Sequence, residues 1–129
     1  MLIYYFTRTG RSKQIAETLA QKLGIAALPI TDGKNWSGIL GYLRAGFAAL
    51  RGKSLPAVYK APTETEPVLL VFPIWAGGFP PAVRTFVQEV GRTQITALVT
   101  SLGSTLKDRE GFVKIIDLVG KDISAPEEL

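Results

Sequence analysis

The chain of 129 residues contains no cysteine and no histidine. Without cysteine there are no disulfides, no thiolate metal sites and no cysteine nucleophile, which excludes the cysteine phosphatases. Without histidine the commonest general base and the commonest metal ligand are both missing, and so is every Ser-His-Asp triad. These two absences exclude many classes of enzyme, and we predict no metal site and no catalytic side chain.

Long apolar runs are also missing. No stretch approaches the roughly 20 residues that span a bilayer, so we expect no membrane partner. The chain enters apolar sequence at Met1 without a basic leader, and the first run ends at Phe6, which argues against a signal peptide. We therefore expect a cytoplasmic protein that folds as a single domain over residues 1–129.

The charge that is present is mildly basic, with a formal net value of +4. Such a balance favours anionic partners, including phosphates and acidic proteins. Basic residues are spread along the chain and only mildly enriched over 51–60, so we do not expect nucleic-acid binding. Arg44, Arg51 and Lys53 suit either a solvated helix face or a docking surface for an acidic partner.

Three short, nearly continuous apolar runs predict buried strands: "LIYYF" at 2–6, "VLLVF" at 68–72 and "ITALVT" at 95–100. Continuous rather than alternating runs are typical of parallel strands covered on both faces. A weaker run, "IAALPI" at 25–30, contains Pro29, which cannot donate to a sheet ladder and so indicates an edge strand.

Helical periodicity appears between these runs. Apolar stripes cover residues 15–23, residues 39–50 and residues 83–90, and Gly24 suits the position after the first helix. Pro80 and Pro81 suit the start of the third helix, where a missing N–H does no harm. Alternating strands and helices predict an α/β fold with a doubly wound, mostly parallel sheet.

The C-terminal part is short, because only 28 residues of the 129 follow Ser101. Residues 112–119 match both a helix and a strand, and we predict a helix from Phe112, Ile115, Ile116 and Val119, which recur at helical spacing. Either choice leaves too few residues for a strand and two helices.

The loops that follow the three best strands should meet at one edge of the sheet, where ligands bind in open α/β folds. The first loop, "TRTGRS" at 7–12, puts three hydroxyls and a glycine at a helix start. Helix N-termini bind anions through free N–H groups, so this loop suits a phosphate, although an ordinary helix cap would look similar. It is not a Walker A motif, which argues against nucleotide triphosphate hydrolysis.

The second loop, "PIWAGGFP" at 73–80, carries Trp75 on a turn that we expect to be exposed. An indole there offers a flat face to a planar ligand, whereas packing under the third helix is the alternative. Gly77 and Gly78 allow positive φ beside a ligand. The third loop, "TSLGS" at 100–104, offers hydroxyl and backbone donors.

Together these loops resemble the flavodoxin family. The resemblance rests on T-x-T-G-x-[ST] after the first strand, Trp75 after the third and T-S-x-G-S after the fourth, and it covers residues 1–104 in order and spacing. It implies a three-layer sandwich that binds FMN. The first loop would hold the phosphate, and the other two would flank the flavin ring. The implied cofactor-binding residues are Thr7, Arg8, Thr9, Gly10, Arg11, Ser12, Pro73, Ile74, Trp75, Ala76, Gly77, Gly78, Thr100, Ser101, Leu102, Gly103 and Ser104.

The chain departs from the family in three ways. Leu102 stands where many flavodoxins have a second aromatic residue, and the chain is basic where flavodoxins are usually acidic. We also expect the final helix of the family to be missing, which would leave part of one sheet face uncovered and suggests a homodimer.

The resemblance implies an electron carrier, with an unknown and acidic redox partner protein. A basic surface favours the anionic reduced flavin, so we expect a comparatively high potential for the second reduction step. Two alternatives stay open: a small FMN-dependent NAD(P)H:quinone oxidoreductase, and an interaction module of the same fold that binds no flavin. A phosphorylated receiver domain is disfavoured. It needs an acidic pair after the first strand and an aspartate after the third, where this chain has hydroxyl residues and Pro-Ile-Trp.

Overall fold

A computed structural model of the chain describes residues 1–31, 59–62, 66–127 and 129. In chain order these residues form β1 (Leu2–Tyr5), α1 (Arg11–Leu23), β2 (Ala27–Pro29), β3 (Val68–Pro73), α3 (Pro81–Val90), a 3-10 turn (Arg92–Gln94), β4 (Ile95–Ser101) and β5 (Lys114–Val119). The predicted helix over 39–50, and Arg44, Arg51 and Lys53, lie outside the described residues.

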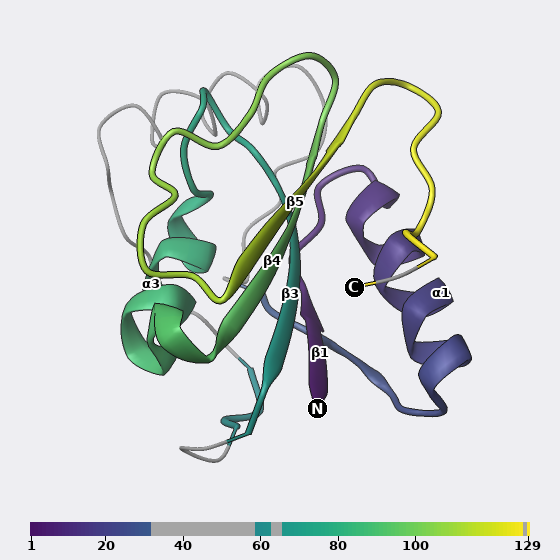
Figure 1. Ribbon diagram of the computed structural model, residues 1–129, viewed down its shortest axis with the longest axis vertical. Helices are drawn as coiled ribbons and strands as arrows, with labels where there is room; N and C mark the ends of the chain where they lie inside the picture. The colour runs from purple at the N-terminus through teal and green to yellow at the C-terminus, as the bar shows by residue number, and fades with distance from the viewer. Residues whose placement is uncertain (32–58, 63–65, 128) are drawn as a thin grey trace.

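The five strands form one parallel sheet in the order β2-β1-β3-β4-β5 (Figure 1). This is the flavodoxin-like order, in which the direction of winding reverses between β1 and β3. The predicted α/β, doubly wound fold is confirmed. Pro29 lies in edge strand β2, as its missing N–H predicts.

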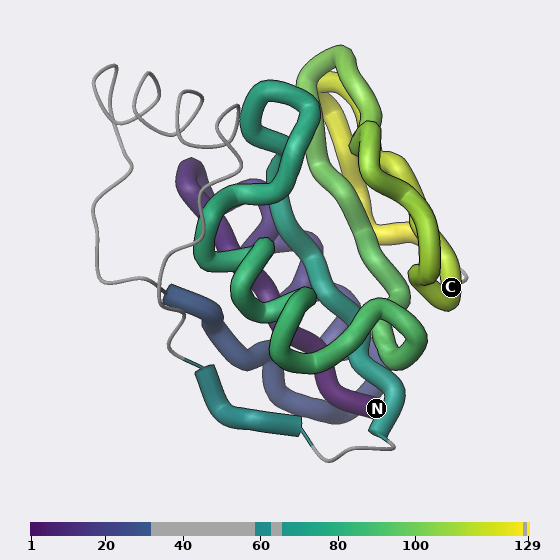
Figure 2. Tube along the Cα trace, turned by 90° about the vertical axis from the view of Figure 1, so that its left-hand side faces the viewer, coloured from purple at the N-terminus to yellow at the C-terminus, as the bar shows by residue number. Residues whose placement is uncertain are grey.

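The sheet forms the middle of three layers, with α1 on one face and α3 on the other (Figures 1 and 2). Successive strand residues alternate between two cores: Ile3 and Leu69 pack with α1, whereas Tyr4 and Leu70 pack with α3. All four side chains are fully buried, which explains why both faces of these strands are apolar. Burying each aliphatic side chain contributes about 1.5–3 kcal/mol.

The end of α1 and the start of α3 lie where the sequence predicts. Gly24 ends α1 in the left-handed conformation with φ 69°, and its N–H group bonds to the carbonyls of Ala20 and Gln21. Pro81 occupies the first turn of α3, and Phe86 and Val87 turn its apolar side to the sheet. Neither described helix is long and apolar enough to cross a membrane.

The predicted helix over 112–119 is wrong, because residues Lys114–Val119 form strand β5 beside β4. The physical reason lies in the adjacent pair Ile115 and Ile116. A strand sends neighbouring side chains to opposite faces, and these two pack against the α3 core and the α1 core respectively. In a helix the two side chains would project only about 100° apart, so they could not reach opposite faces of the sheet.

The C-terminal part is shortened, as expected. Residues 102–113, all of them described, contain no helix, although they connect two parallel strands. After β5 the tail returns along the α1 side (Figure 1), where Ile123 and Ala125 pack against the α1 core. The tail therefore covers part of the face for which we expected exposure, and self-association stays a prediction.

Candidate functional site

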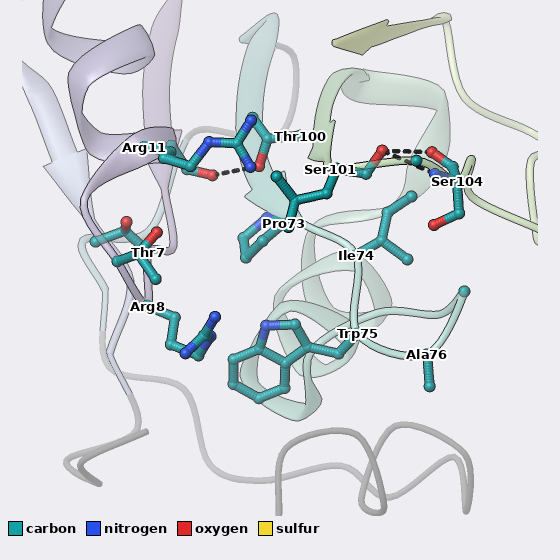
Figure 3. A pocket seen from close by; sticks show the side chains of 15 residues that line it. Thr7, Arg8, Arg11, Pro73, Ile74, Trp75, Ala76, Thr100, Ser101 and Ser104 are labelled. Carbon is teal, nitrogen blue, oxygen red and sulfur yellow. Dashed lines mark hydrogen bonds between the residues drawn. The ribbon is translucent and has the colours of Figure 1, made fainter. Parts of the chain in front are cut away.

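One pocket lies at the carboxyl ends of β1, β3 and β4, where the three predicted loops meet (Figure 3). Its volume of about 350 Å³ falls within the range of roughly 300–1,000 Å³ that is usual for small-molecule sites. Fifteen of the seventeen predicted site residues line it, and Gly10 and Gly78 are the two that do not. The topology thus brings together three loops that are far apart in the sequence.

The first loop turns backbone groups toward the pocket. Gly10 has φ 96° and directly precedes α1, and its own N–H donates to the Thr7 hydroxyl oxygen over 2.9 Å. Among the described residues, no side chain caps the N-terminus of α1. The first turn of the helix therefore presents N–H groups and about half a positive charge toward the pocket. Gly10 shapes this loop without lining the pocket.

Ser12 does not cap the helix or turn its hydroxyl to solvent, as a serine at a helix start often does. Its side chain is buried, and its hydroxyl shares a 2.9 Å hydrogen bond with the Thr100 hydroxyl, which is the dashed line that ends at Thr100 in Figure 3. This bond joins the first loop to the end of β4. The Ser12 hydroxyl is thus engaged within the protein. The Thr7 oxygen accepts from the Gly10 N–H, so the Thr7 hydroxyl proton and the Thr9 hydroxyl are the groups of the first loop that can face a ligand.

The electrostatics of the pocket are uniformly positive. Arg8 and Arg11 line it, and no carboxylate side chain does so among the residues described. Arg11 also donates to the carbonyl of Gly120, just beyond β5, so its guanidinium is held at the edge of the sheet. Two cations and a helix N-terminus together favour an anionic ligand.

The second loop is a tight reversal of the chain. Trp75 and Gly78 exchange two backbone hydrogen bonds of 3.0 Å, and the residues between them, Ala76 and Gly77, have φ values of 55° and 79°. Positive φ at both central positions is the pattern of a type I′ turn. The sequence suggested positive φ at Gly77 and Gly78, whereas the structure places it at Ala76 and Gly77.

The prediction that Trp75 is exposed is wrong. Only 5% of its surface is accessible, and its ring meets that of Phe6 edge-on, with centroids 5.4 Å apart. The tight turn is the reason, because it directs the indole back toward β1 rather than outward. Trp75 still lines the pocket, and in Figure 3 its indole and the Arg8 side chain point toward one another.

The third loop is held by its own hydroxyls. The Ser101 hydroxyl donates to the Ser104 carbonyl and accepts from the Ser104 N–H, which fixes the loop end over the pocket. Leu102 projects outward and is 68% exposed. It is the most accessible large apolar side chain in the lining and is available for contact with the apolar part of a ligand.

Sequence reasoning missed two residues that support the pocket. The Lys107 N–H donates to the Gly77 carbonyl over 3.1 Å, and Gly120 accepts from Arg11. Neither residue stands in a recognisable motif. Both hydrogen bonds use backbone atoms of these residues, which leave no signature in side-chain identity, so only the folded chain could reveal them.

Comparison with known proteins supports the fold. No protein-family model matches the chain, and no curated protein matches its sequence. A flavoprotein from Lactobacillus acidophilus NCFM, solved in complex with FMN, aligns with a TM-score of 0.70 at 14% identity, over 90% of this chain and 91% of that one. A candidate flavoprotein from Bacteroides uniformis ATCC 8492 aligns with a TM-score of 0.69 at 20% identity, over 94% and 90% of the two chains. A further candidate flavoprotein, from Bacteroides eggerthii DSM 20697, aligns with a TM-score of 0.66 at 19% identity, over 92% of this chain and 86% of that one. At such identities the likeness shows that the chain has the same α/β fold as these proteins.

Proposed function

We propose that this protein binds FMN in the pocket and acts as an electron carrier. The observation that carries the proposal is the convergence of the three loops on one positively charged pocket at the switch in strand order. The structural likeness to a flavoprotein solved with FMN supports it.

The residues present fit this cofactor. The uncapped start of α1, with Thr7, Thr9, Arg8 and Arg11 around it, suits a phosphate dianion. The remaining walls are less polar and suit a planar ring. Because Trp75 is largely buried, we expect Ile74 and Leu102 to supply more of the ring contact than the indole face does.

FMN, when bound, supplies the electron-transfer chemistry, and the protein supplies binding, orientation and electrostatics. The backbone of Ala76 and Gly77 lies beside the ring side of the pocket and can exchange hydrogen bonds with a ligand there. Arg8 and Arg11 stabilise negative charge in the pocket. We therefore expect the second reduction step at a less negative potential than in acidic flavodoxins, which a redox titration measures.

The binding experiment compares FMN with riboflavin, which lacks the phosphate. We expect purified protein to take up FMN and to bind riboflavin at least about 100-fold more weakly, since charge-assisted phosphate contacts account for the difference. Arg8→Ala should weaken FMN binding more than riboflavin binding, and so reduce the difference between the two affinities. Lys22→Ala is the matched control, because Lys22 lies in the last turn of α1, at the end away from the pocket. Equal affinity for the two flavins, or no uptake of either, would contradict the proposal.

A carrier and an NAD(P)H-dependent oxidoreductase are separated by one further mixing experiment. We expect the FMN-loaded protein to react slowly or not at all with NADPH in the absence of oxygen. Rapid bleaching of the flavin absorbance would favour the oxidoreductase instead. The proposed partner is an acidic redox protein, and its electron exchange with this chain should slow as salt is added.

A further inference from the structure

Arg92 lies outside the pocket, in the 3-10 turn that follows α3. Its guanidinium donates to both carboxylate oxygens of Asp108, at 2.6 Å each, and to the Glu110 carbonyl at 2.8 Å. The same group sits over two aromatic rings, with its Cζ atom 5.5 Å from the centroid of Phe79 and 4.9 Å from that of Phe112. One side chain thus contacts four residues of two separate segments.

Both segments hold the turn that lines the pocket. Asp108 is next to Lys107, whose N–H donates to the Gly77 carbonyl over 3.1 Å. The Lys107 side chain also packs on Gly77, so closely that a Cβ atom there would lie 2.9 Å from its Cε atom. On the other side, Phe79 directly follows Gly78 and is fully buried. Arg92 therefore reaches the turn through Asp108 and through Phe79.

This turn needs outside support. Ala76 has φ 55°, a left-handed conformation that costs a residue with a Cβ atom about 1–2 kcal/mol. Strained backbone of this kind persists only where the surrounding structure holds it. The segment 102–113 has no helical hydrogen bonds of its own with which to do so. Its position depends on side-chain contacts such as the Arg92–Asp108 pair.

We propose that Arg92 is a positioning residue for the ligand pocket, acting through Asp108 and Phe79 to fix the 75–78 turn. The charge-assisted pair is consistent with this role, because the hydrogen bond from Arg92 lowers the pKa of Asp108 and keeps it ionised. The effect on flavin rests on the proposed function above, whereas the effect on the turn does not.

The test compares Arg92→Met with a matched control, Lys13→Met. Lys13 also pairs with a carboxylate, that of Glu17 at 3.7 Å, but both residues lie on α1 and neither lines the pocket. Each variant removes one positive charge and one ion pair and puts the same side chain in its place. They differ in whether the lost contact leads to the turn.

The first readout is amide hydrogen exchange in the protein without flavin. We expect Arg92→Met to speed exchange at Lys107 by about tenfold and Lys13→Met to change it by less than about threefold, since local openings follow the contacts that are lost. Unchanged exchange at Lys107 in Arg92→Met, or equal effects of both variants, would overturn the inference. Protection of the Leu70 amide in β3 reports whether each variant stays folded.

The second readout uses FMN. Arg92→Met should weaken binding by about tenfold and shift the flavin absorbance, because a loosened turn pays an ordering cost on binding. If the natural protein bound no FMN, the proposed function would fail and the exchange measurement would still decide the role of Arg92. If Arg92→Met failed to fold, Arg92→Lys would replace it, because lysine keeps the charge and loses the two-pronged hydrogen bond. Unchanged exchange at Lys107 in Arg92→Lys would then overturn the inference.

Discussion

Two connections cross from one parallel strand to the next in the C-terminal half, and they are built differently. Residues 74–94 connect β3 to β4 through α3, which buries Val83, Phe86 and Val87 against the sheet. Residues 102–113 connect β4 to β5 without a helix, and are held by Leu106, Phe112 and two arginine–aspartate pairs. Parallel strands need a crossover of about a dozen residues, and a helix is only the usual solution.

The difference teaches where stability and adaptability lie in this fold. A helix satisfies its own backbone and presents a continuous apolar side, so it resists local opening. The second connection depends on a few side chains, several of them exposed, and should open more readily. The second connection also supports the 75–78 turn from outside, through the hydrogen bond from the Lys107 N–H to the Gly77 carbonyl. Breaking each connection at its most buried side chain is therefore the most direct comparison.

The largest effect is expected from Phe86→Ala in α3. Phe86 is fully buried between the sheet and the rings of Tyr4 and Tyr59, at centroid distances of 4.9 Å and 4.7 Å. Removing such a ring should lower the free energy of unfolding by about 3–5 kcal/mol. Urea denaturation followed by tryptophan fluorescence measures it. A loss below 1 kcal/mol would show that α3 is not the dominant cover of this face.

Leu106→Ala in the second connection should cost less. Leu106 is 1% exposed and is the only described residue of 102–111 in the buried core. We expect about 2–3 kcal/mol, the lower part of the range for buried leucines, because an irregular segment can collapse into the space. The same denaturation experiment checks it. A cost equal to that of Phe86→Ala would mean that the two connections contribute alike.

The loops that follow β3 and β4 offer a finer test. Ala76, after β3, has positive φ, whereas Gly103, after β4, does not, and a Cβ atom on Gly103 would meet no atom within 4 Å. Ala76→Gly should therefore raise the free energy of unfolding by about 0.5 kcal/mol, once the greater freedom of unfolded glycine is subtracted. Gly103→Ala should be tolerated without loss. Thermal unfolding of both variants measures the contrast, and destabilisation by Ala76→Gly would contradict it.

The smallest effect concerns pH. The hydrogen bond from Arg92 lowers the pKa of Asp108, so this pair stabilises the folded state above the unfolded pKa near 4 and loses that contribution as pH falls through the lower folded value. Because the Asp108 side chain is 53% exposed, we expect only a few tenths of a kcal/mol, reduced further by salt. The protection factor of the Lys107 amide, which corrects for the intrinsic pH dependence of exchange, should follow this loss between pH 5 and pH 3. Asp108→Asn should remove the change of that protection factor with pH.

Sequence patterns predicted the elements that local periodicity determines. The strands β1, β3 and β4 followed from continuous apolar runs, and α1 and α3 from apolar stripes bounded by Gly24 and Pro81. Strand β5 was missed because residues 112–119 match the helical and the extended periods equally well. Its state is decided by the free edge of β4, which is a tertiary feature that no local window contains.

The candidate site divides in the same way. Which residues line the pocket could be predicted, because parallel strands bring their carboxyl ends to one edge. How they lie could not. The Ser12–Thr100 bond joins residues 88 positions apart. The burial of Trp75 depends on a turn with positive φ at Ala76, which an alanine does not predict. These features depend on pairwise geometry across the sheet.

The hydroxyl pair of Ser12 and Thr100 has a kinetic consequence. Since two walls of the pocket are already joined before any molecule enters, capture of a ligand need not wait for them to come together. We expect the observed association rate to rise in proportion to ligand concentration, with a rate constant of at least about 10⁵ M⁻¹s⁻¹ and no plateau from a slow closing step.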